Sequence, residues 1–174
     1  MSVIPRLETD RLILREPVLG DYDDYAAMWR EPEVLRFTQR VAPPPELMWS
    51  RFLRNAGFWR HLGFGLFTVE EKATGRFVGQ VGFFDARREI EPSLIGLAEA
   101  GWTLGSSFHG KGYGLEATGA LIAWGGRELP GRRAVAIIDV GNVASRGLAE
   151  RLGFAAVMET DYQGHRLTLL ERWL

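Results

Sequence analysis

The pattern of apolar and polar residues along the chain predicts strands and helices in mixed order. Apolar and charged residues alternate over 11–15, which is typical of an edge strand, and Pro17 ends it. Apolar residues at helical spacing then predict a helix for which Asp21 is the N-cap. After the prolines at 43–45, a second helix is predicted over 46–62.

From residue 64 onward, strands dominate the pattern. The segments 64–71 and 76–85 predict a hairpin, because Thr74-Gly75 supplies the residues of a tight turn. The later predicted elements are a strand over 95–104, a helix over 114–127, a strand over 134–139, a short helix over 142–154 and a hairpin of 154–161 with 165–173 around Gln163-Gly164. This order predicts an α/β chain in which a mixed sheet carries helices on its faces.

Composition excludes several classes of protein. The 174 residues suit one domain over 1–174, and a formal net charge of −1 provides no basic field for nucleic acid or an anionic membrane. The chain has no cysteine, which excludes disulfides, a thiol nucleophile and thiolate metal sites. It also has no apolar run near the ~20 residues of a membrane span. We therefore expect a soluble protein, and the absence of cysteine suits a cytoplasmic location.

The stretch LGSSFHGKGYGLEATG, residues 104–119, holds the clearest candidate chemistry. Gly110, Gly112 and Gly114 surround Lys111 and lead directly into a predicted helix. Without side chains at alternate positions, the backbone can curl and point its N–H groups at an anion. The helix that begins there adds the positive end of its dipole. The stretch therefore predicts a metal-free site for a pyrophosphate.

Two other phosphate-binding motifs match this stretch less well. Gly105, Gly110 and Lys111 fit the P-loop pattern G-x-x-x-x-G-K, but Gly112 stands where a serine or threonine hydroxyl must hold a metal ion. Only about sixty residues follow, fewer than the parallel strands and crossovers of such a fold need. A dinucleotide fingerprint needs glycine where Leu115 stands. A P-loop-type nucleotide hydrolase stays as the alternative enzyme.

The run from His109 to Gly114, HGKGYG, followed by Leu-Glu-Ala, resembles the pyrophosphate motif of the GCN5-related N-acetyltransferase (GNAT) superfamily. His109 departs from the glutamine or arginine of that motif. Four further segments resemble the ribosomal-protein-alanine N-acetyltransferase (RimJ/RimL-type) branch in order and spacing: LETDRLILREP, TGRFVGQVGFF, AEAGWTL and NVASRGLAERLGF. The resemblance covers nearly the whole chain, apart from residues 36–62.

The resemblance implies a GNAT fold, with a central mixed, mostly antiparallel sheet of about seven strands, splayed between its fourth and fifth strands and flanked by about four helices. By this resemblance, the splayed strands would be 95–104 and 133–139, and the pantetheine arm of acetyl-CoA would lie between them like an added strand. Acetyl-CoA is the implied cosubstrate, and no metal is implied. The implied coenzyme-binding residues are Trp102, Thr103, Leu104, His109, Gly110, Lys111, Gly112, Tyr113, Gly114, Asn142 and Ser145.

Acetyl transfer from a thioester to an amine needs a neutral amine, an oxyanion donor and help for the departing thiolate. The resemblance assigns a hydrogen bond to the sulfur to Ser145 of the N-x-x-S run, and Asn142 of that run would also cap its helix. A backbone N–H near Trp102 is the expected oxyanion donor. Glu99 is the candidate base, because partial burial would make a carboxylate a better base, and Asp161 or a water relay is the alternative.

The expected acceptor is a primary amine, either a protein N-terminus or a small molecule, in a pocket between the first two helices and the last hairpin. Asp23, Asp24 and Glu46 would attract a cationic acceptor or simply begin their helices. A protein that binds acetyl-CoA without catalysis is a further alternative, and the resemblance leaves a homodimer through the closing strands open. Aromatic residues at helical spacing are more often core, although some of them would wall the pocket: Phe37, Trp49, Phe52, Phe58 and Trp59.

Overall fold

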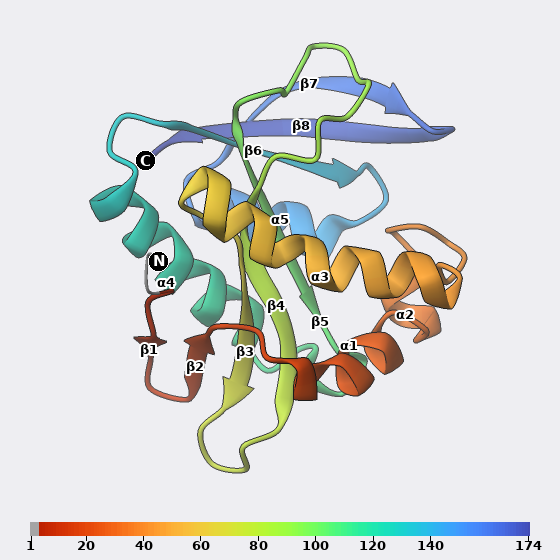
Figure 1. Ribbon diagram of the computed structural model, residues 1–174. Coiled ribbons are helices and arrows are strands. Elements are labelled where there is room, and N and C mark those ends of the chain that lie inside the picture. Colours follow the sequence, from red (N-terminus) through yellow and green to blue (C-terminus); the bar gives the residue numbers. More distant parts are fainter. Residues whose placement is uncertain (1–3) are drawn as a thin grey trace.

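The computed structural model describes residues 4–174, and Figure 1 shows a sheet with helices on both sides. The helices are α1 (Tyr22–Met28), α2 (Pro32–Leu35), α3 (Pro45–Leu62), α4 (Tyr113–Glu128) and α5 (Val143–Arg151), with 3-10 turns η1 (Leu19–Asp21) and η2 (Ser106–Phe108). The strands are β1 (Leu7–Glu8), β2 (Leu12–Arg15), β3 (Leu66–Glu71), β4 (Phe77–Phe84), β5 (Ala98–Leu104), β6 (Arg133–Asp139), β7 (Ala155–Tyr162) and β8 (His165–Trp173). The described residues thus form one strand and one helix more than the resemblance implied.

The sheet has the order β1-β2-β3-β4-β5-β6-β8-β7, and its neighbouring strands are antiparallel except β5 with β6. This confirms the mixed, mostly antiparallel sheet. The prediction of an edge strand over 11–15 is wrong, because β1 pairs with β2 and places it inside the sheet. Ile13, which the alternation placed on the polar face, is only 7% exposed.

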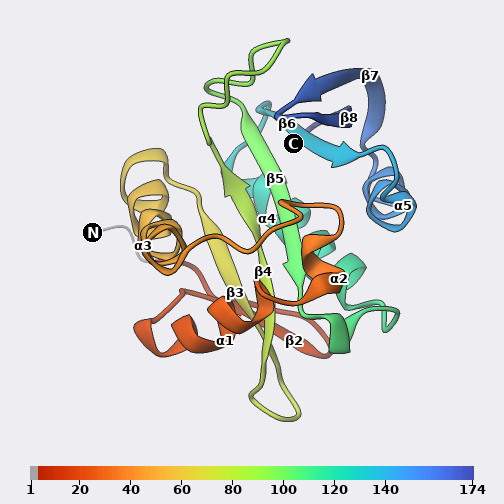
Figure 2. The same cartoon turned by 90° about the vertical axis from the view of Figure 1, so that its right-hand side faces the viewer.

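The predicted splay is confirmed between β5 and β6. These strands pair at two positions, Ala98 with Ala134 and Glu99 with Val135. From Ala100 onward, β5 stays paired with β4 while β6 stays paired with β8, so the two strands diverge. Figure 2 shows β5 running down the molecule while β6 turns away toward α5. Within residues 4–174, the facing edges of both strands therefore lack a strand partner over their C-terminal halves.

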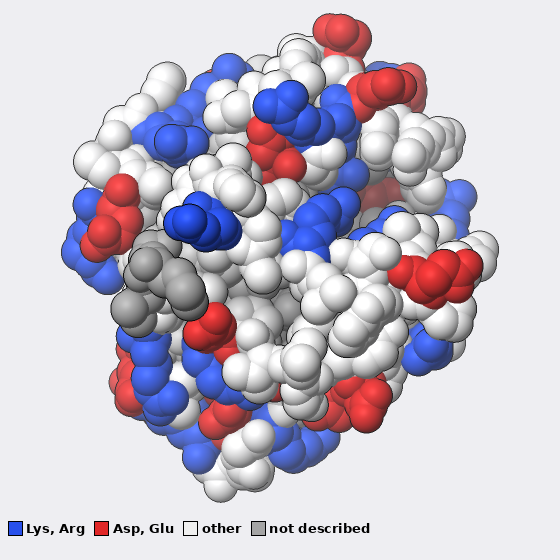
Figure 3. Space-filling model, in the orientation of Figure 1, with Lys and Arg blue, Asp and Glu red and all other residues white. Residues whose placement is uncertain are grey.

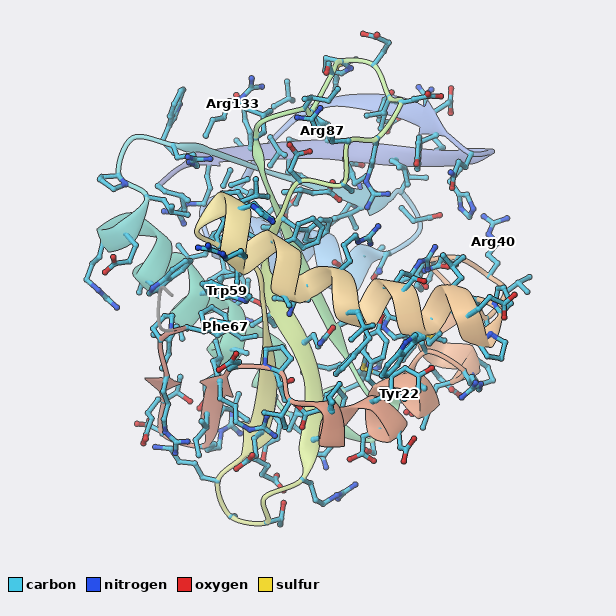
Figure 4. All side chains as sticks on the ribbon, viewed as in Figure 1. Tyr22, Arg40, Trp59, Phe67, Arg87 and Arg133 are labelled. Atoms are coloured by element: carbon cyan, nitrogen blue, oxygen red, sulfur yellow. The ribbon has the colours of Figure 1, made fainter. Side chains whose placement is uncertain are left out.

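Aromatic packing covers both faces of the sheet. Trp124 of α4 packs against Phe67 and Phe83, with ring centroids 5.6 and 6.4 Å apart. On the other face, α1 and the first half of α3 form a smaller cluster around the fully buried Met48. Trp59, in the second half of α3, joins the larger cluster 4.9 Å from Phe67, and Figure 4 labels both residues. A sheet packed on both faces provides a rigid frame for the splay.

The start of α1 is fastened to the sheet by Asp21. The residue stands at the N-cap position as predicted, but its side chain does not cap the helix. Its carboxylate instead accepts hydrogen bonds from Arg15 at 2.8 and 2.9 Å, from the Thr68 hydroxyl at 2.9 Å and from the Val18 N–H at 3.0 Å. Burial opposes the charge, but these donors outweigh it and lower the pKa of Asp21. Helix α1 is thereby tied to β2 and β3.

Candidate active site

A cleft of about 810 Å³ lies between α3, the splayed ends of β5 and β6, and the β7–β8 hairpin. This volume is typical of small-molecule sites, which span about 300–1,000 Å³. Figure 3 shows charged side chains in the hollow above α3. Strand β5 and the start of α5 bring five of the predicted site residues to this one cleft: Glu99, Trp102, Thr103, Asn142 and Ser145.

The glycine-rich loop presents a row of main-chain N–H groups. Gly110 and Gly112 adopt left-handed φ angles of 72° and 78°, which turn successive peptide groups into a concave nest. Within the described part of the chain, the N–H groups of residues 110–115 have no hydrogen-bond acceptor. Gly114 lies close to Leu148 of α5: a Cβ atom added at Gly114 would stand 3.0 Å from the Leu148 side chain. Six adjacent unpaired donors at the N-terminus of α4, next to α5, are suited to bind an anion.

Side chains from the N-terminal hairpin hold this loop in place. The Arg11 guanidinium donates to the Lys111 carbonyl oxygen at 2.9 Å and lies 4.4 Å from the centre of the Tyr113 ring. Arg11 is itself held by Glu116, whose Oε2 accepts from the arginine Nε at 2.7 Å. Burial opposes the charge on Glu116, but hydrogen bonds from Thr9 and Arg11 outweigh it and lower the pKa of Glu116. The Lys111 carbonyl is thereby turned to Arg11.

Two side chains of the loop are directed to the protein. The Tyr113 hydroxyl donates to Glu71 at 2.6 Å, and this hydrogen bond raises the pKa of Tyr113. The His109 Nε2 lies 2.9 Å from the Leu104 carbonyl oxygen, which only accepts, so this nitrogen carries a proton. The Leu104 side chain packs in the core and does not line the cleft, which leaves its main chain for the predicted contact with the coenzyme. The loop therefore offers mainly its main chain to a ligand.

Ser145 and Trp102 form a hydrogen bond across the splay. The Trp102 indole N–H, on β5, donates to the Ser145 hydroxyl oxygen, on α5, at 2.9 Å. Asn142 caps α5 as predicted, because its side-chain oxygen accepts from the Ser145 N–H at 3.1 Å. Since the Ser145 oxygen accepts from the indole, its own proton is available to a ligand in the cleft. This geometry fits the hydrogen bond to a departing sulfur that the resemblance implies for Ser145.

Glu99 lines the cleft as a buried, ion-paired carboxylate. Its two oxygens accept from Nε and Nη2 of Arg88 at 2.9–3.1 Å, and the residue is 5% exposed. Burial opposes the charge on Arg88, but Glu99 outweighs it and raises the pKa of Arg88. A carboxylate has about four acceptor positions, and the three hydrogen bonds from Arg88 leave one for a group in the cleft. The sequence pattern did not predict this ion pair.

Asp161, the alternative base, lies outside the cleft. Its side chain is 71% exposed, and its Oδ2 accepts from Arg166 at 2.9 Å. The residue belongs to β7, the last strand of the sheet, where side chains on one face point to solvent. The structure therefore removes Asp161 as a base at this site.

The aromatic residues predicted as core or pocket wall divide between three environments. Phe37 and Phe58 are half-buried and line the cleft. Phe52 and Trp59 are buried in the core. Trp49 is 41% exposed on the outer side of α3, because its position on the helix faces neither the sheet nor the cleft. Two of the five thus contribute to the site.

Basic residues of the cleft were missed by the sequence analysis. Arg51 and Arg54 of α3 line it together with Arg88. Their three-residue spacing on a predicted helix places Arg51 and Arg54 on one face, which was the available clue. At another part of the cleft, the Asp139 Oδ2 lies 3.6 Å from the His165 Nδ1. These groups converge only because α3, β6 and the closing hairpin fold around one cavity.

Of the two interpretations of the acidic helix starts, the structure supports the plain helix start over attraction of a cationic acceptor. Asp23 and Asp24 in the first turn of α1, and Glu46 in the first turn of α3, are exposed to solvent and do not line the cleft. Such positions complement the positive end of a helix dipole, which explains these residues without a ligand.

The described residues contain no group of three or more His, Cys, Asp or Glu side chains placed to hold a metal ion. Nor is any helix in the described part of the chain long and apolar enough to cross a membrane. After the glycine loop, β6 pairs antiparallel with β8, whereas a P-loop fold continues with parallel strands. The sheet therefore disagrees with the P-loop alternative.

Comparisons with known proteins identify the family of the chain. A model of the acetyltransferase (GNAT) domain matches residues 11–155. A structure assigned to the GNAT acetyltransferase family from Bordetella pertussis is 31% identical, with a TM-score of 0.86 over 97% of this chain and 99% of that chain. An uncharacterised N-acetyltransferase of Bacillus licheniformis is 29% identical over 152 residues, 85% of this chain and 81% of its own. RimL, a ribosomal L7/L12 alpha-N-protein acetyltransferase solved with coenzyme A, shares the fold at 19% identity, with a TM-score of 0.77 over 99% of this chain and 98% of that chain. The chain therefore belongs to the GNAT family of acetyltransferases.

Proposed function

We propose that the protein is an acetyl-CoA-dependent N-acetyltransferase that transfers the acetyl group directly to a primary amine. The observation that carries this proposal is the row of six unpaired N–H groups over residues 110–115. These donors suit the diphosphate of a coenzyme, and they lie next to α5, whose Ser145 lines the cleft. Membership of the GNAT family supports acetyl transfer as the reaction.

The coenzyme would extend from the loop into the splay. Its diphosphate would bind the main chain of residues 110–115, and its amide-bearing arm would pair with the unpartnered edges of β5 and β6. Trp102 and Thr103 line this part of the cleft, while Leu104 would contribute its main chain alone. When bound, the coenzyme supplies an activated acetyl group as a thioester.

The side chains of the cleft suit a single displacement. A bond forms between the amine nitrogen and the acetyl carbon, and the carbon–sulfur bond breaks. The Ser145 hydroxyl donates a hydrogen bond to the departing thiolate, and an unpaired N–H of β5 near Trp102 stabilises the oxyanion. The amine proton passes to the remaining acceptor position of Glu99, directly or through water.

Thermal unfolding with two cofactors tests the coenzyme assignment. Acetyl-CoA at 100 times its dissociation constant, without magnesium, should add about 2.7 kcal/mol of stability and raise Tm by roughly 5–10 °C. ATP with magnesium should leave Tm unchanged. A shift with ATP and magnesium, and none with acetyl-CoA, would contradict the proposal and favour a nucleotide hydrolase.

Release of free coenzyme A in the presence of amines tests the transfer step. A panel of N-terminal peptides, amino acids, polyamines and simple amines should contain acceptors that release thiol above the rate without amine. Binding of acetyl-CoA with no release by any amine would identify a protein that binds the coenzyme without catalysis.

A further inference from the structure

We infer that Arg51, Arg54 and Arg88 form an anion-binding subsite, so that the acceptor is an amine that also carries a carboxylate or a phosphate group. We call these three residues the arginine subsite. The inference rests on the proposed function and specifies its acceptor.

The three guanidinium groups converge on one cleft from two segments. Arg51 and Arg54 lie three positions apart on α3 and therefore share a helix face. Arg88 follows β4, and all three residues line the cleft that Ser145 also lines. Burial, together with the like charges of Arg54 and Arg88, lowers the pKa of Arg51. Figure 3 shows basic side chains in the hollow above α3.

Two of the three charges have no anionic partner. Arg88 is neutralised by Glu99, but Arg51 donates to the neutral side-chain oxygen of Gln39 at 2.5 Å. Within residues 4–174, Arg54 makes no hydrogen bond or ion pair, and its guanidinium lies 5.4 Å from the centre of the Phe58 ring. Positive charges held together in a partly enclosed cleft attract an anion, and guanidinium groups bind carboxylate and phosphate in the same bidentate way.

The other acid of the cleft does not balance this charge. Asp139 and Glu99 are the two carboxylates that line the cleft. Asp139 accepts from the Gly141 N–H at 2.8 Å and lies 3.6 Å from His165 and 3.9 Å from Arg40. Asp139 thus has basic neighbours of its own. The excess positive charge therefore stays with Arg51 and Arg54, on the α3 side of the cleft.

Matched acceptors test the inference in the wild-type protein. One pair is an α-amino acid and its amide, and the other is phosphoethanolamine and ethanolamine, so the two pairs distinguish carboxylate from phosphate. In at least one pair, the anionic member should be acetylated with a kcat/KM about 10-fold higher or more. Equal or better use of the neutral members in both pairs would overturn the inference.

Variants of the two unneutralised arginines test where the preference arises. Arg51→Gln and Arg54→Gln should each raise KM for the preferred anionic acceptor about 10-fold and change kcat/KM for the neutral partner less than about 2-fold. Arg60→Gln, at an exposed position of α3 outside the cleft, is the matched control and should change neither value. Equal losses for both acceptors, or no loss in either variant, would contradict the arginine subsite.

A binding measurement separates this inference from the proposed function. With coenzyme A saturating the loop, inorganic phosphate should raise Tm of the wild-type protein and leave Tm of Arg51→Gln unchanged. If inorganic phosphate does not raise Tm of the wild-type protein, the inference is overturned. This test does not depend on whether any amine of the two pairs is acetylated. If neutral amines are acetylated as efficiently as their anionic partners, the arginine subsite is contradicted but the proposed function is not. If the protein fails to bind acetyl-CoA, the proposed function itself is contradicted.

Discussion

The two ends of the candidate site are built in different ways. The coenzyme end, by which we mean residues 109–115 and the β5–β6 splay, presents main-chain N–H groups. The acceptor end, by which we mean the arginine subsite with Phe37 and Phe58, presents side chains from α3 and the segments beside it. A site made of main-chain groups thus needs only a few adjacent residues, whereas a site made of side chains needs several distant segments to meet.

The two ends also differ in how firmly they are held. Arg11, Glu116 and the Tyr113–Glu71 hydrogen bond fasten the loop of the coenzyme end from outside. At the acceptor end, Arg51 has a neutral partner, and Arg54 has none among the described residues. A preorganised site loses little entropy on binding. We therefore expect substitutions at the coenzyme end to act through binding of acetyl-CoA, and substitutions at the acceptor end to act through KM for the amine.

Gly110→Asp should break the coenzyme end with the largest effect. A carboxylate among the N–H groups should repel the diphosphate and lower acetyl-CoA affinity about 100-fold or more, or about 2.7 kcal/mol, in a calorimetric titration. Gly131→Asp is the matched control, because both glycines have a φ of 72° and open space around a Cβ atom. Similar losses in the two variants would show that backbone strain, rather than the anion site, is responsible.

Asp21→Asn should separate stability from binding. Asp21 ties α1 to β2 and β3, and removing its charge leaves Arg15 with a weakened partner, so unfolding in urea at pH 7 should cost about 3 kcal/mol less. Acetyl-CoA affinity of the folded variant should stay within about 2-fold of wild type, because the loop is fastened elsewhere.

The stabilities of the wild-type protein and Asp21→Asn should also respond differently to acid. The pKa of Asp21 is lower in the folded than in the unfolded protein, so its ionised form stabilises the fold above the unfolded value of about 3.9. This contribution is lost as the pH falls from about 4 through the lower folded value. The difference in unfolding free energy between wild type and Asp21→Asn should therefore shrink below pH ~4, and a constant difference from pH 7 to pH 3 would contradict the assignment.

Ser145→Ala should affect chemistry more than binding. Loss of a hydrogen bond to the departing sulfur should lower kcat about 10-fold and change acetyl-CoA affinity less than about 2-fold. Ser50→Ala, at an exposed position on α3, is the control and should behave as wild type. An unchanged kcat in Ser145→Ala would remove the catalytic role of this hydroxyl.

Trp102→Phe should have the smallest effect and should depend on Ser145. The substitution keeps an aromatic ring but removes the N–H that donates to the Ser145 oxygen at 2.9 Å, so kcat should fall about 3-fold. In the Ser145→Ala background, the same substitution should have almost no further effect. If the kcat losses of the two single variants multiply in the double variant, the indole of Trp102 does not orient the Ser145 hydroxyl.

The predicted hairpin turn and helix start, which depend on neighbouring residues, were accurate. The turn at Gln163-Gly164 is confirmed, because both residues adopt positive φ angles of 50° and 77° between paired strands. The helix after the glycine loop begins at Tyr113, one residue before the predicted start. Each of these features depends on a few adjacent residues, so the local sequence contains the information needed.

Three features that depend on distant partners were predicted wrongly or not at all. The segment 11–15 is not an edge strand, because the short β1 pairs with it. Asp161 faces solvent on the last strand, a position that depends on the order of β7 and β8 in the sheet. The Glu99–Arg88 ion pair joins residues eleven positions apart in a cleft, and the sequence contains no pattern that pairs them.

The sequence by itself determined the nest of N–H groups at residues 110–115, the helix behind it and the family of the chain, because glycine conformation and helix capping are local properties of the backbone. Only the tertiary structure decided which side chains line the cleft. Arg51, Glu99 and Ser145 lie on three separate elements, and their meeting depends on where β5 and β6 diverge and how α3 crosses the sheet. The net charge of a site is the sum over all side chains that converge there, so it can be determined only when the fold that brings them together is known.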